Sequence, residues 1–398
     1  MNAGSLHLKE FIKGDRLIWT IIFMLTIYSL LAVYSASGGM SVYQNGINTF
    51  FLAKHIPYII LGLTFTWLVS KLHYTELNKW APVLLVVATI LLIWTLMFGV
   101  NINQAKRWIQ LPFLDITIQV SDFAKIALIC YVARAISARQ DSIKSIKSGL
   151  MPLLIPVVLI CGLIAPANFS TAALLFTTCL MMLFVGRVSI AALVGLLGLG
   201  VGMFLVLIFL ADYFPDSIRA TTWLTRIQEF ITNDEGGYQI QQAKIAIANG
   251  NWIGVGPGNS VLRNFIPYVY ADFIFAIIVE EMGIIFGGIG LISLYLLLLW
   301  HCVGIVSRTP KAFGALLTIG IGLNIILQAF ANMAVSLELV PVTGLTLPLV
   351  SMGGSSLLFT SISFGMIISV SKHINELNLE NDENSEMNSE NLQDEYND

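Results

Sequence analysis

The chain has 398 residues, of which 56% are hydrophobic and only 11% are charged, and its mean hydropathy is +0.80. Soluble domains carry about 25% charged residues, so the composition excludes an ordinary soluble protein and indicates an integral membrane protein. The formal net charge of −3 includes nine acidic and no basic residues between 374 and 398. The rest of the chain has 21 basic and 15 acidic residues, a balance of +6.

Apolar stretches of nearly 20 residues, the length that crosses about 30 Å of hydrocarbon, recur along the chain. The sequence therefore predicts an all-α, polytopic membrane protein with ten spanning helices, and an even number places both termini on one side. The predicted spans are residues 16–36, 51–70, 81–99, 116–134, 150–165, 168–185, 189–211, 272–300, 311–336 and 351–371.

The distribution of basic residues predicts the orientation, because lysine and arginine are retained on the cytoplasmic side. If the N-terminus is inside, thirteen basic residues lie in cytoplasmic segments and seven outside, and four of those seven fall in one large outer loop at about 212–271. We therefore predict a cytoplasmic N-terminus (1–15), a membrane domain (16–371) in the cytoplasmic, or inner, membrane and a cytoplasmic tail (372–398). The tail has too few apolar residues to fold alone and is predicted to be disordered, either as a solubilising extension or as a docking segment.

Asp272 is the most informative single residue, because it stands where the eighth predicted span begins. A carboxylate at this boundary is costly unless it is capped, paired or used. Aspartate is also a favoured N-cap, so capping is the alternative to a catalytic role. On its helical face Ala276, Val279 and Gly283 are small and would leave a groove below it.

Three further acidic residues and one lysine lie within predicted spans. Glu280 and Glu281 follow Asp272 by eight and nine residues, about 12 Å deeper if the helix is continuous. An ion pair with Lys125 is one interpretation for either glutamate. Asp122 and Lys125 share a helix face at i and i+3, which favours an ion pair, whereas Lys125 in a polar cavity would bind diphosphate.

The predicted outer ends of three spans favour anions. The sequences IQVSDFAK, YADFIFAIIVEE and SMGGSS begin spans on the outer side, and helix N-termini carry partial positive charge that attracts anions. The outer loops add basic residues to this field, although contact with anionic lipid headgroups is the alternative. They are Arg107, Arg219, Arg226, Lys244 and Arg263. Ser355 and Ser356 either donate hydrogen bonds to a ligand or belong to a small-residue packing surface.

Several motifs together resemble the SEDS family (shape, elongation, division and sporulation), which includes FtsW and RodA. They are RWIQL (107–111), QVSDFAK (119–125), YQIQQAKIAIANG (238–250), GVGPGNSV (254–261), ADFIFAIIVEE (271–281) and VPVTGLTLPLVSMGGSS (340–356). The resemblance covers about residues 15–371, and GNSV and GLTLPL are more similar to FtsW than to RodA.

The resemblance implies a peptidoglycan glycosyltransferase that polymerises lipid II on the outer face of the membrane during cell division. It implies that Asp272 is the general base that takes a proton from the attacking sugar hydroxyl. The substrate-binding residues implied are Arg107, Asp122, Lys125, Gln239, Lys244, Arg263, Ser355 and Ser356. The implied partners are a class B penicillin-binding protein, other division proteins and membrane lipids, with no nucleic acid. No cofactor is required by the sequence, and a divalent cation, Mg or Mn, is a candidate aid to diphosphate departure.

The chain departs from the family pattern at three positions. Asp122 replaces the usual glutamate, Asn168 replaces an aspartate and Met352 replaces a tyrosine. These changes affect the secondary polar contacts more than Asp272. Three other functions remain as alternatives: a lipid II flippase, a RodA-like elongation polymerase and a non-catalytic division scaffold.

Overall fold

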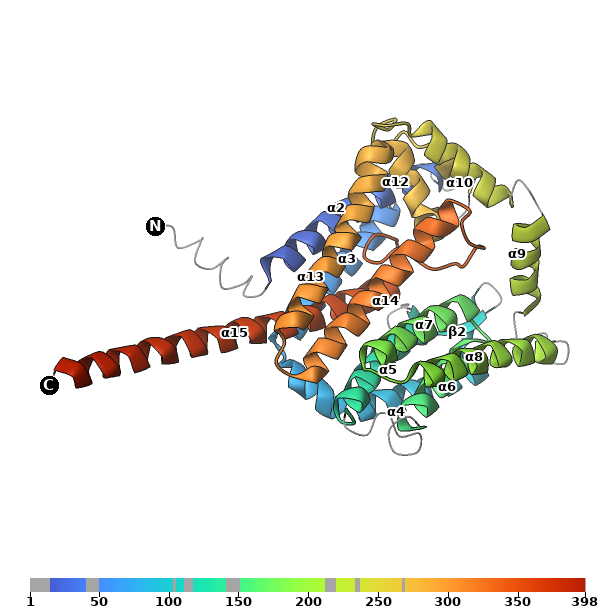
Figure 1. Cartoon of the computed structure of the whole chain (residues 1–398). Coiled ribbons are helices and arrows are strands. Elements are labelled where there is room, and N and C mark those ends of the chain that lie inside the picture. The colour runs from blue at the N-terminus through green and yellow to red at the C-terminus, as the bar shows by residue number, and fades with distance from the viewer. Residues whose placement is uncertain are drawn as a thin grey trace.

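The computed structural model describes residues 15–40, 50–102, 105–110, 117–140, 151–211, 220–232, 237–266 and 269–397. Most of the predicted N-terminal segment and parts of the predicted loop at 212–271 lie outside these ranges. The all-α membrane architecture is confirmed, and each predicted span coincides with helical structure (Figure 1). The helices of the first half are α2 (Arg16–Met40), α3 (Phe50–Lys71), α4 (Tyr74–Phe98), α5 (Val120–Ser137), α6 (Met151–Ile164), α7 (Phe169–Val185) and α8 (Ile190–Ala211).

The second half of the chain contains shorter helices before three long ones. They are α9 (Ala220–Thr232), α10 (Tyr238–Asn249), η2 (Leu262–Asn264), α11 (Val269–Asp272), α12 (Ile274–Met282), η3 (Gly283–Ile289), α13 (Gly290–Arg308), α14 (Ala312–Ser336) and α15 (Ser355–Asn397). Among the described residues, seven helical stretches are long and apolar enough to cross a membrane, and α6 and α7 are shorter apolar helices. Ten crossings stay a prediction.

A small antiparallel sheet precedes α5 and was not predicted. Its strands are β1 (Val100–Ile102), β2 (Ala105–Gln110) and β3 (Thr117–Gln119), in the order β1-β2-β3. Trp108 pairs with Gln119, the residue before α5. The fourth span therefore starts as a helix at Val120, and the sheet fixes Arg107 beside the start of that helix.

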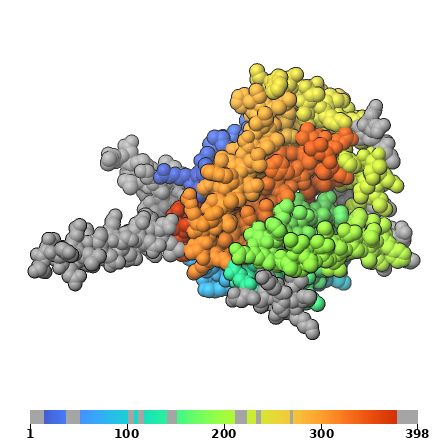
Figure 2. Space-filling model, in the orientation of Figure 1, coloured from blue at the N-terminus to red at the C-terminus, as the bar shows by residue number. Residues whose placement is uncertain are grey.

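The centre of the bundle consists of α5 and α14, whose side chains are buried on most sides. Figure 2 shows one face of the molecule, where α7 and α8, in green, lie beside α13 and α14, in orange. Both described ends of the membrane domain meet, because Asp15 accepts a hydrogen bond from Ser371 of α15. The described ends thus lie on one side of the bundle, as an even number of crossings requires.

The prediction of one helix over 272–300 is wrong, because the chain reverses at Gly283. This glycine has φ of +75°, a conformation that favours glycine. The next two N–H groups donate to the carbonyls of Asn251 and Trp252, at 2.9 and 3.2 Å. A Cβ on Gly287 would lie 2.5 Å from the Ile278 carbonyl oxygen, although nine residues of continuous helix span about 13 Å. Hence α12 forms a hairpin with η3, which packs beside it and leads into α13 (Figure 1).

The reversal changes the position of both glutamates. Glu281 bonds Ser35 near one end of α2, whereas Phe286, further along the hairpin, accepts from Tyr28 nearer the middle of α2. The chain after Gly283 thus runs back toward the Asp15 end, and α12 runs away from it. Because α12 runs away from the Asp15 end, the two glutamates lie farther from that end than Asp272 does. The prediction that they lie deeper in the membrane is therefore wrong.

Both glutamates hold the loop before η2. Glu280 accepts from the Ser260 hydroxyl and from the N–H groups of Val261 and Leu262, at 3.1 and 3.3 Å, through both of its oxygens. Glu281 accepts through Oε1 alone, from the Ser35 hydroxyl and from two loop N–H groups at 3.0 and 3.1 Å. The predicted pairing with Lys125 is wrong for both, because backbone amides and hydroxyls satisfy them.

The C-terminal tail also differs from the sequence prediction of disorder over 372–398. The backbone of α15 continues as a helix to Asn397 and projects away from the bundle (Figure 1). The segment 372–397 contains neither glycine nor proline. A helix already formed in the membrane domain extends by adding one hydrogen bond per residue, without a new nucleation step.

Glu280 accepts hydrogen bonds through both carboxylate oxygens and Glu281 through one. The same Glu→Gln substitution should therefore destabilise the protein to different extents at the two positions. Glu280→Gln places an NH₂ group against an N–H donor, whereas Glu281→Gln can keep its three bonds on the remaining oxygen. Because a buried unsatisfied donor costs about 1–3 kcal/mol, Glu280→Gln should lower the melting temperature in detergent more than Glu281→Gln. An equal or reversed order would show that these hydrogen bonds do not hold the hairpin.

Candidate functional site

A polar cavity of about 410 Å³ lies where four helices begin. Its wall includes Gln119, Asn168 and Phe273, which directly precede α5, α7 and α12, and Ser356 in the first turn of α15. Helix N-termini carry partial positive charge. The starts of α5, α7, α12 and α15 therefore converge on the cavity. The prediction that the three starts face one side is wrong for α12, because α12 runs away from the Asp15 end whereas α15 runs toward it.

Five charged side chains line the cavity. Arg107 comes from β2, Arg226 from α9, Asp122 and Lys125 from α5, and Asp272 from the end of α11. Three cations against two carboxylates leave a formal charge of +1, to which the helix N-termini add. The electrostatic field of the cavity therefore favours a ligand with concentrated negative charge.

The backbone that carries Asp272 is fixed by three hydrogen bonds to three consecutive carbonyls. The Met352 N–H donates to Tyr270 at 3.1 Å, and the Ser351 hydroxyl donates to Ala271 at 2.7 Å. The Asn332 amide donates to the carbonyl of Asp272 itself at 2.9 Å. Two separate elements, α14 and the segment before α15, thus set the position of the carboxylate.

The Asp272 side chain is partly buried and faces the cavity. Phe273 is the N-cap residue of α12 and makes no side-chain cap bond, and no described backbone N–H donates to the Asp272 carboxylate. The capping alternative is therefore not supported. A Cβ on Gly344, where φ is +65°, would lie 3.6 Å from Oδ2, so glycine leaves that side of the carboxylate open. Burial raises the pKa of Asp272, while Arg107 and Arg226 oppose the rise.

Asp122 and Lys125 form the predicted ion pair and also line the cavity. Their charged atoms lie 2.9 Å apart, and Lys125 Nζ also donates to Gln328 at 3.1 Å. The second oxygen of Asp122, Oδ2, is buried and has no hydrogen-bond partner among the described residues. One acceptor of the pair is therefore available to a ligand.

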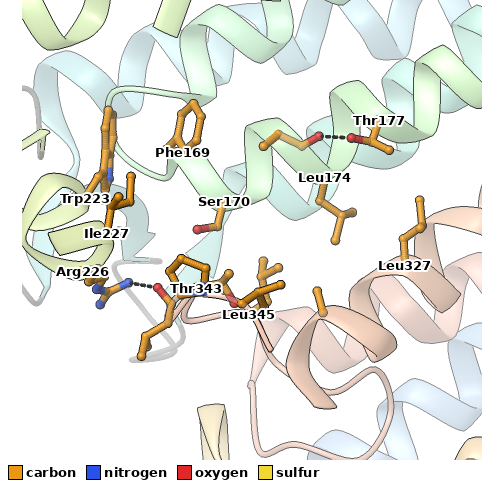
Figure 3. A pocket seen from close by; sticks show the side chains of 15 residues that line it. Phe169, Ser170, Leu174, Thr177, Trp223, Arg226, Ile227, Leu327, Thr343 and Leu345 are labelled. Atoms are coloured by element: carbon orange, nitrogen blue, oxygen red, sulfur yellow. Dashed lines mark hydrogen bonds between the residues drawn. The ribbon is translucent and has the colours of Figure 1, made fainter. Parts of the chain in front are cut away.

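An apolar groove of about 390 Å³ adjoins the polar cavity and shares Ser170, Trp223 and Arg226 with it. Figure 3 shows Leu174 of α7 and Leu327 of α14 on its walls, with Arg226 at its polar end. The groove predicted below Asp272 is wrong, because Ala276 and Val279 are buried against the neighbouring elements. The apolar surface lies instead between α7, α9, α14 and the segment at 340–345.

A family model described as the cell cycle protein family FtsW/RodA/SpoVE matches residues 15–376. The chain belongs to this family. It is 34% identical over 361 residues to a probable peptidoglycan glycosyltransferase FtsW of Coxiella burnetii, covering 88% of this chain and 95% of that protein. It is 32% identical to stage V sporulation protein E of Bacillus subtilis, covering 90% and 97% of the two chains.

Solved structures share the fold of this family member. One belongs to a peptidoglycan synthase complex, described as showing the structural coordination of polymerization and crosslinking. It has a TM-score of 0.69 at 24% identity and covers 91% of this chain and 99% of its own. The rod shape determining protein RodA of Thermus thermophilus has a TM-score of 0.64 at 22% identity, covering 91% and 97%. The multi-pass membrane fold is thus shared over nearly the whole chain.

The structure brings together most of the residues predicted from the family resemblance. Asp272, Arg107, Asp122, Lys125, Gln239 and Ser356 all line the cavity. The other three predicted residues do not. Lys244 pairs with Glu338 at 2.5 Å, Arg263 donates to the Ser35 carbonyl at 3.3 Å, and Ser355 accepts from the Gln119 N–H at 3.0 Å. Lys244 and Ser355 belong to the same motifs as residues of the cavity, and Arg263 lies shortly after another motif, but the three side chains make structural contacts instead of lining the cavity.

Arg226 and Gln328 also line the cavity. The sequence analysis counted Arg226 among the outer basic residues without predicting it to bind substrate, and it did not single out Gln328. Arg226 lies outside the recognised motifs, and its guanidinium donates to the Val342 carbonyl at 3.0 Å. Gln328 lies within an apolar span and donates to the Thr346 carbonyl at 2.9 Å. A polar amide in the middle of a membrane helix was the available signal for Gln328.

Two departures from the family pattern keep a structural role here. Asn168 caps α7 by accepting from the Thr171 N–H at 3.3 Å, which an aspartate would do equally well. Met352 contacts Tyr270 through its backbone N–H, so this contact does not depend on the side chain. Asp122 reaches Lys125 although its side chain is one methylene shorter.

The buried ion pair predicts non-additive effects on stability. Asp122→Asn or Lys125→Met alone leaves one charge without its partner, and such losses cost about 3–5 kcal/mol. The double variant removes both charges and should be more stable than the sum of the single effects. Melting temperatures of the four proteins measure this coupling, and strictly additive shifts would contradict it.

Proposed function

We propose that this protein is a peptidoglycan glycosyltransferase that polymerises lipid II, with Asp272 as the general base. The observation that carries the proposal is one carboxylate, anchored through three backbone carbonyls, in a cavity with Arg107, Arg226 and Lys125. The FtsW-named relatives, at 30–34% identity over most of the chain, support the reaction class.

The charges of the cavity suit two events in the reaction, which are the loss of a proton by the attacking hydroxyl and the departure of an anionic diphosphate. A sugar hydroxyl must lose its proton as it attacks the anomeric carbon, and Asp272 is placed to accept it. The bond to the lipid diphosphate breaks at the same time, and this group leaves as an anion that needs cations rather than an acid. Arg107, Lys125, Arg226 and the helix N-termini supply that stabilisation.

The adjoining groove suits a lipid-linked substrate. Its walls are largely apolar, with Leu174, Ile227 and Leu327, while Arg226 lies where groove and cavity meet. A polyprenyl chain in the groove would place its diphosphate at Arg226 and its sugar in the cavity. Holding both reactants in line contributes to the rate, in addition to proton transfer.

A divalent cation stays part of the proposal. Among the described residues, no group of three or more His, Cys, Asp or Glu is arranged to hold a metal ion. Mg²⁺ usually takes one or two carboxylates together with substrate phosphates, and Asp122, with its unpartnered Oδ2, fits one such ligand. The ion would add positive charge beside the departing diphosphate.

The alternatives are less well supported. A flippase needs a polar path through the bundle, but Glu280 and Glu281 lie beyond Asp272 in the other direction. Below the cavity there is a space of about 20 Å³ near Asn324, followed by buried apolar side chains such as Ile129 and Leu317. A scaffold role would not require a charged cavity. The FtsW names of the relatives favour division over elongation, although the sporulation relative has comparable identity.

The same similarities support the partners and the orientation. The solved peptidoglycan synthase complex combines polymerization and crosslinking. A class B penicillin-binding protein therefore fits as the crosslinking partner, together with other division proteins. The basic residues support cytoplasmic termini, and this orientation would place Asp272 on the outer side of the cytoplasmic membrane, where lipid II is polymerised.

The central prediction concerns Asp272→Asn. Because a positioned base contributes about 10² to 10⁴ in rate, the purified variant should lose lipid II polymerisation by that factor while keeping its melting temperature. Glycan products resolved by gel electrophoresis provide the measurement. Retained polymerisation would remove Asp272 as the base, and lipid II transport without polymerisation would favour the flippase.

Two arginines and a lysine form a matched control series. Arg107→Gln and Arg226→Gln remove cavity cations and should slow polymerisation. Lys244→Gln removes the same charge from the surface pair with Glu338 and should have little effect. A large loss in the lysine variant would contradict the assignment made from the structure.

The raised pKa of Asp272 predicts the acidic limb of the pH profile. Only the ionised carboxylate accepts a proton, so polymerisation should fall as pH decreases through this raised pKa. Arg226 stabilises the ionised form. Arg226→Gln should therefore move the limb to higher pH, whatever its effect on the maximal rate. Initial rates measured across pH test this shift. If the acidic limb stays at the same pH or moves to lower pH, Arg226 does not stabilise the ionised form of Asp272.

A further inference from the structure

A second polar cavity, of about 230 Å³, lies at the opposite end of the bundle. It is formed where α2 begins, where α13 ends and where α15 passes residue 371 (Figure 1). Its polar lining consists of Asp15, His301, Arg308, Ser371 and Asn375. The proposed glycosyl transfer uses none of these residues.

The one carboxylate among the described lining residues is already satisfied. Asp15 Oδ2 accepts from His301 Nε2 and from the Ser371 hydroxyl at 2.9 Å, and Oδ1 accepts from the Leu17 N–H at 3.1 Å. Because a carboxylate is only an acceptor, the His301 nitrogen that faces it, Nε2, carries a proton. The acidic group holds three elements together and is not available to attract a cation.

Arg308 is a charged residue of the cavity whose side chain is not paired with another described residue. It lies in the last turn of α13, and its guanidinium has no hydrogen bond or ion pair with another described residue. A guanidinium presents five donors in a planar fork that matches phosphate oxygens. Among the described residues, the cavity therefore combines an unpaired arginine with the Asn375 amide as hydrogen-bond donors to an anion.

The remaining walls are apolar, and among them Trp300 and Val303 are exposed whereas Ile305 and Ile374 are buried. Val303, Ile305 and Ile374 line the cavity, and the Trp300 side chain beside it is 70% exposed. Trp300 lies eight residues before the end of α13, and its exposed ring offers an apolar surface to a lipid. A soluble anion would contact the polar groups but would gain nothing from these walls, whereas the glycerol and first methylenes of a lipid would contact them.

We propose that this cavity binds the phosphate headgroup of an anionic phospholipid from the membrane leaflet at this end. Arg308 would hold the phosphate by paired hydrogen bonds, with the Asn375 amide beside it and Trp300 against the lipid chain. Basic pockets between membrane helices bind anionic headgroups in this way. Such a lipid would join the ends of α2, α13 and α15, and α13 leads directly to the hairpin that carries Asp272.

The test uses the full-length protein in neutral detergent, titrated with phosphatidylglycerol or phosphatidylcholine while the melting temperature is recorded. Phosphatidylglycerol should raise it with saturation, and phosphatidylcholine should not. Arg308→Gln should weaken the apparent affinity by about 10- to 100-fold, as loss of a charge-assisted hydrogen bond implies. Lys311→Gln removes the same charge three residues away, outside the cavity, and should leave the affinity unchanged.

Inorganic phosphate distinguishes the two sources of the ligand chemistry. If phosphate alone reproduces the stabilisation and Trp300→Ala leaves phosphatidylglycerol binding intact, the site takes a free anion and the lipid assignment is wrong. If Arg308→Gln responds to phosphatidylglycerol as the unmodified protein does, the cavity is not the site. Should Arg308→Gln fail to fold, Arg308→Lys keeps the charge without the fork and should show weaker saturable binding.

Discussion

The arrangement of the polar cavity depends on the reversal of the chain at Gly283. Glu280 and Glu281 accept hydrogen bonds from the loop before η2, and this loop in turn covers the turn of the hairpin. The first residues of α12 are thereby brought to the starts of α5, α7 and α15, where Asp272 faces the cavity. A straight helix over the same residues would carry its N-terminus elsewhere and would bury two carboxylates among apolar side chains.

Electrostatics and shape then indicate the same kind of ligand. The cavity has excess positive charge and is surrounded by helix N-termini, so an anion is stabilised there without a large rearrangement. The neighbouring groove is apolar and ends at Arg226, so an amphipathic molecule with an anionic junction fits both. In the proposed reaction Asp272, held through its backbone by Asn332 and Ser351, would accept a proton within this field.

The sequence predicted the positions of the spans well, because hydropathy records length and burial in lipid. It could not predict that the chain reverses within residues 272–300, because a hairpin and a straight helix can have the same composition. The adjacent pair Glu280 and Glu281 was a signal, because two carboxylates inside an apolar run require partners. Motif similarity singled out Asp272 and Arg107, which line the cavity. It could not separate them from Lys244, because the contact of Lys244 with Glu338 depends on tertiary structure.

The apolar groove lies on the side of the bundle, and Thr177 on its wall is exposed. A long hydrocarbon tail could therefore enter and leave sideways, without passing through water. Encounter would then depend on diffusion in two dimensions and on the number of such lipids per area of membrane, rather than on a concentration in solution. For an enzyme built this way, the supply of reactant is a property of the surrounding bilayer.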